Sequence, residues 1–365
     1  MKAICGRKDL FEAVQTAGRA VSSRSSLPIL GHLLIRSEED RLRIAATDLE
    51  IGIECAAPAN VQESGSLTVP ARVLTEVLSA LPDTEVAMSV EEGNVVNIKC
   101  GASDYTILGL PAEDFPMLPE VKDDASFKID KSILRDGIKR TLFAVSTEEA
   151  RPQLTGILLS LGEDGVRLVS TDTYRLSVQN CPLIVGKGTL QAIVPHRAMA
   201  ELFRLLSEEE GEIDASVSSS QILFKVGEIT LVSRLIEGQF PNWERVVPAE
   251  HDRKLTTPTA EFLQSIRRVA IVARENANRA VLRTADGKLI VTAESGSVGK
   301  AYEEVEVVKE GDDVEMAFNA KFLLDVLSVI DTEAVDLELT GSLSPAVVKG
   351  QGDENYLCVV MPTMR

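Results

Sequence analysis

The chain has 365 residues and a net charge of −18, with 44% hydrophobic and only 4% aromatic residues. This length exceeds one ordinary domain and fits two or three, and the composition predicts aliphatic cores built from Leu, Ile, Val and Ala. The negative charge, taken alone, argues against a nucleic-acid-binding protein, because duplex affinity is dominated by cations that meet phosphates.

The N-terminal stretch MKAICGRKDLFEA is charged at Arg7, Lys8 and Asp9 and lacks the apolar region of a signal peptide. No apolar run approaches the length of a membrane span, so we expect a cytoplasmic protein.

The five cysteines are scattered and form no C-x-x-C pair, which predicts free thiols. The three histidines lie far apart and no phosphate-binding loop occurs, so we expect no metal and no cofactor.

The first predicted element is an amphipathic helix over residues 9–20, DLFEAVQTAGRA, and related stretches follow at 132–145 and 261–273. The next segment, LPILGHLLI at 27–35, has a counterpart, RPQLTGILLS, at 151–160. Self-similarity at a fixed spacing is the signature of a repeated architecture. We therefore expect an internal repeat.

Strands are predicted where apolar and polar residues alternate, as in RLRIAATDLEIGIEC at 41–55 and QILFKVGEITLVSRLI at 221–236. The first stretch contains the pair Thr47–Asp48, which recurs 124 positions later as Thr171–Asp172. A weaker third copy is predicted at Ala293–Glu294. The spacing of these pairs supports the same repeat that the helices indicate.

A second helix is predicted in each repeat, at residues 69–82, 194–206 and 318–330. Its apolar residues follow an i, i+1, i+4, i+5, i+8 pattern, which is typical of one helix face. In the first copy these residues are Val73, Leu74, Val77, Leu78 and Leu81. Pro70 and Pro195 suit the start of the first two copies, and Asn319 is a good cap at the start of the third.

Three copies of about 120 residues cover the chain, and we predict domains at residues 1–122, 123–249 and 250–365. Charge and proline interrupt the pattern near 119–127 and 247–256, where linkers are expected. Each copy reads as helix, alternating strands, helix, then more alternating strands. This order predicts an α+β domain with antiparallel sheets and helices covering one face.

Basic residues concentrate on the predicted helices. The six helices with their flanks hold 16 basic and 11 acidic residues, a net of +5, which leaves −23 for the rest of the chain. The third position of the second helix is basic in every repeat, and we name these residues the repeat cations: Arg72, Arg197 and Lys321. Solvated helix faces could be mixed by chance. The alternative is one basic surface within an acidic protein, which would bind a polyanion at one place.

Together these motifs resemble the bacterial replicative sliding clamps, the beta subunits of DNA polymerase III. The resemblance rests on SLPILGHLLI (26–35), ATDLEIGIE (46–54), TVPARVL (68–74), LPAEDFP (110–116), STDTYRLSV (170–178), IVPHRAM (193–199), GQFPNWERVVP (238–248) and VVMPTMR (359–365). The motifs span all three repeats in the order of the family. The combination is specific, although single pieces such as LPAEDFP are weak signals.

The resemblance implies three repeated domains of the DNA-clamp fold, with helices lining a pore and antiparallel sheets outside, in a head-to-tail dimeric ring. It implies a processivity factor and no enzyme. The ring would encircle double-stranded DNA without reading its sequence and tether the replicative polymerase. The implied partners are the DNA polymerase III catalytic subunit, the clamp loader, and other polymerases and repair proteins. These bind through linear peptides with a glutamine and one or two bulky apolar residues.

The resemblance implies DNA contacts at Arg24 and Arg151. The repeat cations and four further helix residues complete the predicted DNA-binding surface: Arg135, Lys139, Arg267 and Arg268. The sequence departs from a familiar pattern of the family where Pro152 and Gln153 stand in place of two tyrosines. Tyr174 likewise stands where a histidine is more familiar.

The partner-binding cleft implied by the resemblance would consist of Leu154, Thr171, Tyr174, Arg175, Leu176, Pro241, Arg245, Val246, Leu343, Val359, Met361 and Met364. An apolar surface that contains Met suits one groove serving several peptides. Without the resemblance, these residues would equally fit an ordinary domain core. The dimer interface would join Tyr105 and Ile107 on a domain-one edge strand to Ile271 and Val272 on a domain-three helix.

Two other functions are alternatives to a sliding clamp. An acidic hydrolase would need Asp48 and Asp172 as paired carboxylates, but acids at equivalent places in separate repeats would lie too far apart, because such pairs work within about 10 Å. A scaffold of repeated domains that does not encircle DNA would keep the fold. The solution mass and retention on circular DNA would distinguish a scaffold from a ring.

Overall fold

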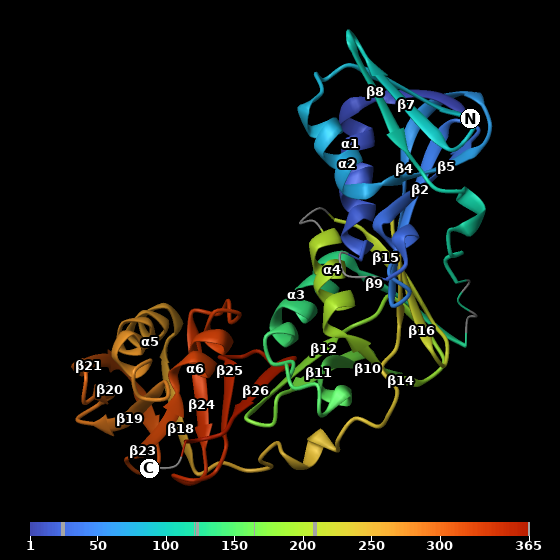
Figure 1. The fold of residues 1–365 in the computed structure, drawn as a ribbon. Coiled ribbons are helices and arrows are strands. Elements are labelled where there is room, and N and C mark those ends of the chain that lie inside the picture. The colour runs from blue at the N-terminus through green and yellow to red at the C-terminus, as the bar shows by residue number, and fades with distance from the viewer. Residues whose placement is uncertain (23–25, 120, 122–123, 164, 207–209, 364–365) are drawn as a thin grey trace. The chain divides into compact units, whose positions relative to one another are not determined.

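The computed structural model describes residues 1–22, 26–119, 121, 124–163, 165–206 and 210–363. Contacts divide the chain into two compact units (Figure 1). The first unit contains Met1–Ile129 with Arg204–Leu235, and the second contains Asp130–Phe203 with Ile236–Arg365. The middle sequence repeat therefore contributes to both units.

The first unit begins with a strand, a helix and a short 3₁₀ turn: β1 (Lys2–Gly6), α1 (Arg7–Ala17) and η1 (Gly18–Ala20). The rest of its first repeat comprises η2 (Pro28–Gly31), β2 (His32–Glu38), β3 (Arg41–Thr47), β4 (Ile51–Glu63), β5 (Ser66–Pro70), α2 (Ala71–Ala80), β6 (Glu85–Glu91), β7 (Val95–Cys100), β8 (Ser103–Leu108) and η3 (Ala112–Asp114). The middle repeat adds β9 (Ala125–Asp130), β15 (Glu212–Val217), β16 (Gln221–Val226) and β17 (Ile229–Arg234).

The long strand β4 explains why the first unit crosses the repeat boundary. Its residues 51–54 pair antiparallel with β17, while its residues 59–63 pair with β1. Within the first unit the sheet therefore runs β9-β15-β16-β17-β4-β1-β6-β7-β8, with β3, β2 and β5 attached to it through β4. The two predicted alternating segments each span two strands: 41–55 contains β3 and the start of β4, and 221–236 contains β16 and β17.

The second unit takes from the middle repeat α3 (Lys131–Leu142), η4 (Pro152–Leu154), β10 (Gly156–Gly162), β11 (Gly165–Thr171), β12 (Arg175–Cys181), β13 (Val185–Lys187), β14 (Leu190–Pro195), α4 (His196–Leu205) and η5 (Trp243–Arg245). The third repeat supplies β18 (Arg253–Pro258), α5 (Thr259–Ala273), β19 (Arg279–Ala285), β20 (Lys288–Ser295), β21 (Gly299–Glu306), β22 (Val308–Glu310), β23 (Glu315–Asn319), α6 (Ala320–Leu327), β24 (Ala334–Leu339), β25 (Ala346–Gly350) and β26 (Tyr356–Val360).

The second unit also joins two repeats through one sheet. Strand β12 of the middle repeat pairs with β26 of the third, within the order β14-β10-β11-β12-β26-β25-β24-β18-β22. A smaller sheet has the order β21-β20-β19-β23. These pairings are antiparallel, and helices pack on the strands, as α5 does on β20 and β21. The predicted α+β class is confirmed.

The predicted second helices occur as α2, α4 and α6, but the buried face of α2 is narrower than the predicted stripe. Leu74 and Leu78 are fully buried, whereas Val73 is 41% exposed. A helix that lies on a sheet buries the i, i+4 row, and a residue 100° away along the helix turns toward solvent. The prediction for Val73 was therefore wrong, and the apolar pattern alone overstated the width of the face.

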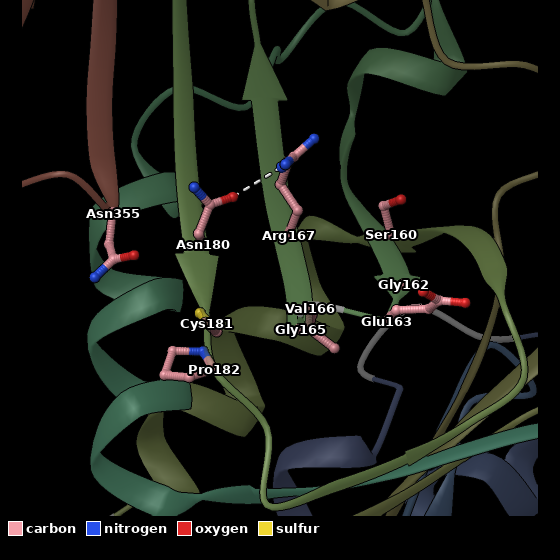
Figure 2. A pocket seen from close by; sticks show the side chains of 10 residues that line it. All are labelled: Ser160, Gly162, Glu163, Gly165, Val166, Arg167, Asn180, Cys181, Pro182 and Asn355. Carbon is pink, nitrogen blue, oxygen red and sulfur yellow. Dashed lines mark hydrogen bonds between the residues drawn. The ribbon is translucent and has the colours of Figure 1, made fainter.

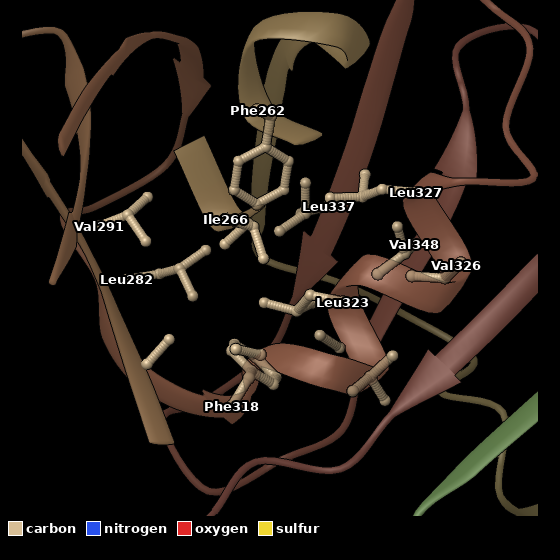
Figure 3. Close-up of a cluster of buried hydrophobic side chains, with 14 of the residues drawn as sticks. Phe262, Ile266, Leu282, Val291, Phe318, Leu323, Val326, Leu327, Leu337 and Val348 are labelled. Carbon is tan, nitrogen blue, oxygen red and sulfur yellow. The ribbon is translucent and has the colours of Figure 1, made fainter. Parts of the chain in front are cut away.

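The core of the third repeat lies between helices and sheets. Phe262 and Ile266 of α5 meet Leu323 of α6 and strand residues such as Leu282 and Val291 (Figure 3). Almost all of its members are aliphatic, as the low aromatic content predicted. This packing holds α5 and α6 as neighbours, so their polar faces point out of the core.

Candidate functional site

The repeated Thr-Asp pair forms a tight turn between two strands. In the first copy, Thr47 Oγ1 donates to the Ile51 carbonyl (2.8 Å) and accepts from the Leu49 N–H (3.0 Å). Asp48 Oδ1 accepts from the N–H groups of Glu50 and Ile51 at 3.0 and 2.9 Å. Leu49 has φ 77°, which is uncommon outside glycine, and these side-chain hydrogen bonds hold it there.

The second copy has the same hydrogen bonds. Thr171 Oγ1 donates to the Arg175 carbonyl (2.7 Å) and accepts from Thr173 N–H (3.1 Å), and Thr173 has φ 78°. Asp172 Oδ1 accepts from the N–H groups of Tyr174 and Arg175, both at 3.0 Å. The aspartate of each turn therefore accepts hydrogen bonds from the backbone of that turn. The motif has a structural role, in place of the paired-carboxylate chemistry of a hydrolase.

The third copy of this motif was placed wrongly by two residues. Ala293–Glu294 lies within β20, before the turn. Ser295, which is 124 residues after Thr171, occupies the equivalent position, and its Oγ accepts from the Ser297 N–H at 3.3 Å. The sequence match failed because a serine replaces the threonine and the aspartate is absent.

Arg175 is held on every side by its own chain, and its side chain is only 8% exposed. Its Nε donates to Asp172 (3.0 Å), its Nη1 to Asp325 (2.5 Å), and its Nη2 to the Phe143 carbonyl (2.6 Å). The guanidinium also lies over the rings of Phe322 and Phe143, at 4.6 and 5.1 Å. It thus links the middle and third repeats within the second unit.

An apolar cavity of about 460 Å³ lies beside the second Thr-Asp turn. Five of the predicted cleft residues line it: Leu154, Thr171, Leu176, Pro241 and Val246. Trp243 of η5 also lines it, and so does Gln153, one of the three departures from the family pattern. We call this space the apolar cavity.

Val359 supports the apolar cavity from beneath. It pairs with Leu176 across the β12–β26 boundary and is fully buried. Together with Leu154 and Val169 it belongs to a buried cluster against which Trp243 packs. Val359 therefore does not line the cavity. It packs beneath Leu176, which does, so Val359 would affect a bound ligand only through the position of Leu176.

The remaining predicted cleft residues lie around this cavity or in neighbouring recesses. Tyr174 is 60% exposed and stacks on Phe322, with ring centroids 6.3 Å apart. The Met361 N–H donates to the Tyr174 carbonyl at 2.8 Å, which ties the C-terminal segment to the turn. Leu343 is exposed in a separate recess of about 440 Å³. Arg245 is exposed on η5, and Met364 lies outside the described residues.

The repeat cations are all exposed on their helices. Arg72 Nε donates to Glu76 at 2.8 Å, one turn along α2, and this hydrogen bond raises the pKa of the Arg72 guanidinium. The equivalent acid of α6, Asp325, binds Arg175 instead, and Lys321 lies at the start of that helix. The repeated basic position is therefore exposed both where the acidic residue one turn later pairs with it, as in α2, and where that acid binds another residue, as in α6.

The other predicted DNA-contacting residues differ in whether they form ion pairs with carboxylates of the same chain. Arg268 of α5 forms a two-pronged ion pair with Glu303 of β21, at 2.8 and 2.5 Å, whereas Arg267 is exposed beside it. On α3, Lys139 pairs with Asp331 at 3.5 Å.

The guanidinium of Arg135, also on α3, lies 5.4 Å from the centroid of the Phe203 ring. Arg151 lines the apolar cavity, and Arg24 lies outside the described residues.

The predicted dimer residues include two that face solvent and two that pack inward. Strand β8 ends its sheet, and Tyr105 is exposed on it while Ile107 is buried. On α5, Ile271 is 64% exposed, whereas Val272 packs partly against the core of the third repeat. Leu108, which the sequence prediction did not include, is the most exposed apolar residue of β8.

All five cysteines are free and buried. Burial raises the pKa of four of these thiols to about 12, and they are Cys5, Cys55, Cys181 and Cys358. At neutral pH they remain protonated, so they are poor nucleophiles and poor metal ligands.

Trp243 and Phe322 are the main site residues that sequence reasoning missed. Trp243 stood within the quoted motif GQFPNWERVVP, so the motif was the available signal. Phe322 stood in a helix whose apolar residues were all assigned to the core. Its contact with Tyr174 joins segments about 150 residues apart, and no local pattern reports such a contact.

Three repeats of α+β structure, joined by antiparallel sheets and carrying exposed cations at one helix position, define a DNA-clamp protein. Family models for the DNA polymerase III beta subunit match residues 1–119 (N-terminal domain), 128–242 (central domain) and 244–364 (C-terminal domain). The chain belongs to the DNA polymerase III beta subunit family. Proteins of this family are sliding clamps, processivity factors of DNA replication and not enzymes.

Individual relatives agree over almost the whole chain. A beta sliding clamp from Staphylococcus aureus is 33% identical over 354 residues, which is 94% of each chain. The DNA polymerase sliding clamp from Bacillus subtilis has a TM-score of 0.97 at 27% identity, covering 100% of this chain and 99% of that one. The clamp from Pseudomonas aeruginosa bound to griselimycin has a TM-score of 0.96 at 34% identity, with both chains fully covered.

Among the residues that the structure describes, no helix is both long and apolar enough to cross a membrane.

Proposed function

We propose that two copies of this chain form a head-to-tail ring around duplex DNA and that each copy tethers replication and repair proteins through the apolar cavity. The observation that carries this function is the recurrence of an exposed cation at one helix position in three successive beta-subunit domains. We divide the chain into domains at 1–122, 123–249 and 250–365, and we place its work in the cytoplasm, where the replicating DNA is.

The DNA-facing surface consists, in this proposal, of the repeat cations with Arg24, Arg135, Lys139, Arg151, Arg267 and Arg268. Three of these cations, Arg72, Lys139 and Arg268, pair with carboxylates, yet this does not oppose the role. Exposed ion pairs contribute little, about 0–1 kcal/mol, so a DNA phosphate can replace the carboxylate at small cost. A surface held by such exchangeable pairs attracts the duplex without fixing it at one register, as sliding requires.

The partner site is the apolar cavity with Tyr174, Leu343 and Met361 around it. The cavity is small enough to hold one or two apolar side chains of a peptide. The glutamine of a partner peptide would meet polar groups of the cavity lining such as Gln153 and Asn242, and Arg245 is exposed on the turn that carries Trp243. Arg175 keeps the turn in place from behind and has its donors engaged with its own chain.

The ring joint combines the β8 edge of one copy with α5 of the other. Tyr105 and Ile271 supply the exposed apolar contacts. Ile107 and Val272 pack inward and support the elements that carry these contacts. Pairing an edge strand at this joint would remove the hazard that a free sheet edge presents. A head-to-tail contact that closes after two copies also stops further growth.

The test is retention on DNA of defined topology. The protein, loaded with its clamp loader onto nicked circular DNA, should remain bound through gel filtration in high salt. It should leave the same DNA after linearisation and should stay on linear DNA whose ends are blocked by bound protein. Equal loss from circular and linear DNA would refute encirclement and favour the scaffold function, and a solution mass of one chain would refute the dimer.

A further inference from the structure

We propose that Arg167 is a positioning residue for the apolar cavity: its guanidinium holds the indole of Trp243 in the cavity wall, although Arg167 lies outside the cavity itself. The inference rests on the proposed role of the cavity as a peptide site. It explains how a wall built on a single 3₁₀ turn keeps its shape.

The cavity and Arg167 share one face of the β11–β12 hairpin. Three cross-strand pairs occupy this face in order along the hairpin: Thr171–Leu176, Val169–Val178 and Arg167–Asn180. They fall on one face because alternate residues of a strand point the same way. The first pair lines the cavity, the second belongs to the buried cluster beneath Trp243, and the third forms the polar end of the same surface.

Arg167 is itself oriented by its neighbours. Its Nε donates to Asn180 Oδ1 at 2.8 Å, as Figure 2 shows on the two neighbouring strands. Its guanidinium carbon lies 5.4 Å from the centroid of the Trp243 ring, and its Nη1 lies 3.7 Å from Glu244 Oε1. One side chain therefore contacts two successive residues of η5 while a strand partner fixes its direction.

These contacts decide the position of the indole. The turn η5 comprises only Trp243–Arg245, closed by a hydrogen bond from the Val246 N–H to the Trp243 carbonyl at 3.0 Å. The apolar cluster buries Trp243 only in part, so packing leaves the rest of the indole without a restraint. The cation over the ring supplies the direction, since a cation prefers the face of an aromatic ring. Without it the indole is free to tilt, and the cavity loses a defined wall.

Trp243 makes this testable, since it is the single tryptophan of the chain. We would prepare Arg167→Gln, which removes the cation, and Arg167→Lys, which keeps it. The matched control is Arg43→Gln: Arg43 occupies the equivalent place 124 residues earlier, belongs to the first unit and pairs with Glu38 and Glu54. Each full-length protein is measured for Trp243 emission, acrylamide quenching and binding of a fluorescein-labelled C-terminal peptide of the replicative polymerase.

For Arg167→Gln we expect a red-shifted emission, stronger quenching and peptide binding weakened by about two- to fivefold, the equivalent of one cation–π contact. Arg167→Lys should lie nearer the unchanged protein, and Arg43→Gln should match it in every measurement. The three proteins should have equal melting temperatures.

Two results would overturn the proposal. The first is Arg167→Gln with unchanged fluorescence and affinity. The second is weaker binding with unchanged fluorescence, because Arg167 would then act on the peptide directly. Failure of the unaltered protein to bind the peptide would instead refute the cavity as a peptide site, whatever the fluorescence of the variants shows.

Discussion

Replacing Arg175 with methionine should strongly destabilise the second unit. The side chain is 8% exposed, makes two ion pairs and one further hydrogen bond, and lies between two aromatic rings. Methionine keeps the aliphatic contacts but leaves Asp172 and Asp325 without their shared cation. Removing one partner of a buried ion pair costs about 3–5 kcal/mol.

The structure favours the lower end of that range. The carboxylates of Asp172 and Asp325 are 18% and 29% exposed, so water can partly replace the lost guanidinium. We therefore expect a loss of about 3 kcal/mol. Arg175→Lys should recover only part of it, because an ammonium cannot reproduce the planar fork that reaches three acceptors.

Urea unfolding followed by Trp243 fluorescence measures this effect, since that residue lies in the same unit as Arg175. The control is Lys300→Met, which removes an exposed ion pair with Glu294 in the same unit and should change stability only slightly. A loss below about 1 kcal/mol for Arg175→Met would mean that the buried network contributes no more than a surface pair, and our reasoning about it would be wrong.

Four further predictions follow from the same structure. Ile271→Glu should shift the solution mass toward one chain at sub-micromolar concentration, and a persistent dimer in light scattering would remove this residue from the joint. Changing all three repeat cations to glutamine should weaken loading on DNA, most strongly at low salt, and should make loading less dependent on salt, with an unchanged circular dichroism spectrum; normal processivity across a salt series would contradict their placement. Deleting residues 361–365 should abolish peptide binding measured by fluorescence polarisation but leave the dimer, and full binding would exclude the C-terminal segment from the site. The four thiols with raised pKa should react with Ellman's reagent at pH 8 only after unfolding, because burial keeps them protonated up to about pH 12; fast reaction of the folded protein would contradict that burial.

Much of the fold could be predicted because its signals are local. The helices α1, α3 and α5 and their counterparts α2, α4 and α6 follow from apolar spacing within about a dozen residues. The three-fold repeat followed from comparing the chain with itself. The α+β class then required only the order of helices and strands in one copy.

The candidate site was predictable only through its resemblance to a family. Spacing alone marked Thr171 and Asp172, and the structure gives both a role in the turn. The resemblance named five residues that do line the apolar cavity. Trp243 was overlooked although it stood between two of the named residues, because a single aromatic residue in a motif does not reveal which way it points.

The sequence by itself determined the repeats, the elements within each repeat and the cations that recur on the second helices, since each depends on residues close together in the chain. Tertiary structure alone decided which repeats share a sheet, through the pairing of β17 with β4 and of β12 with β26. It also decided that Arg175 binds Asp325, 150 residues away, and that Arg167 lies over Trp243. Contacts between distant segments depend on how sheets close and which surfaces they bury, and a local pattern of apolar and polar residues is compatible with many such arrangements.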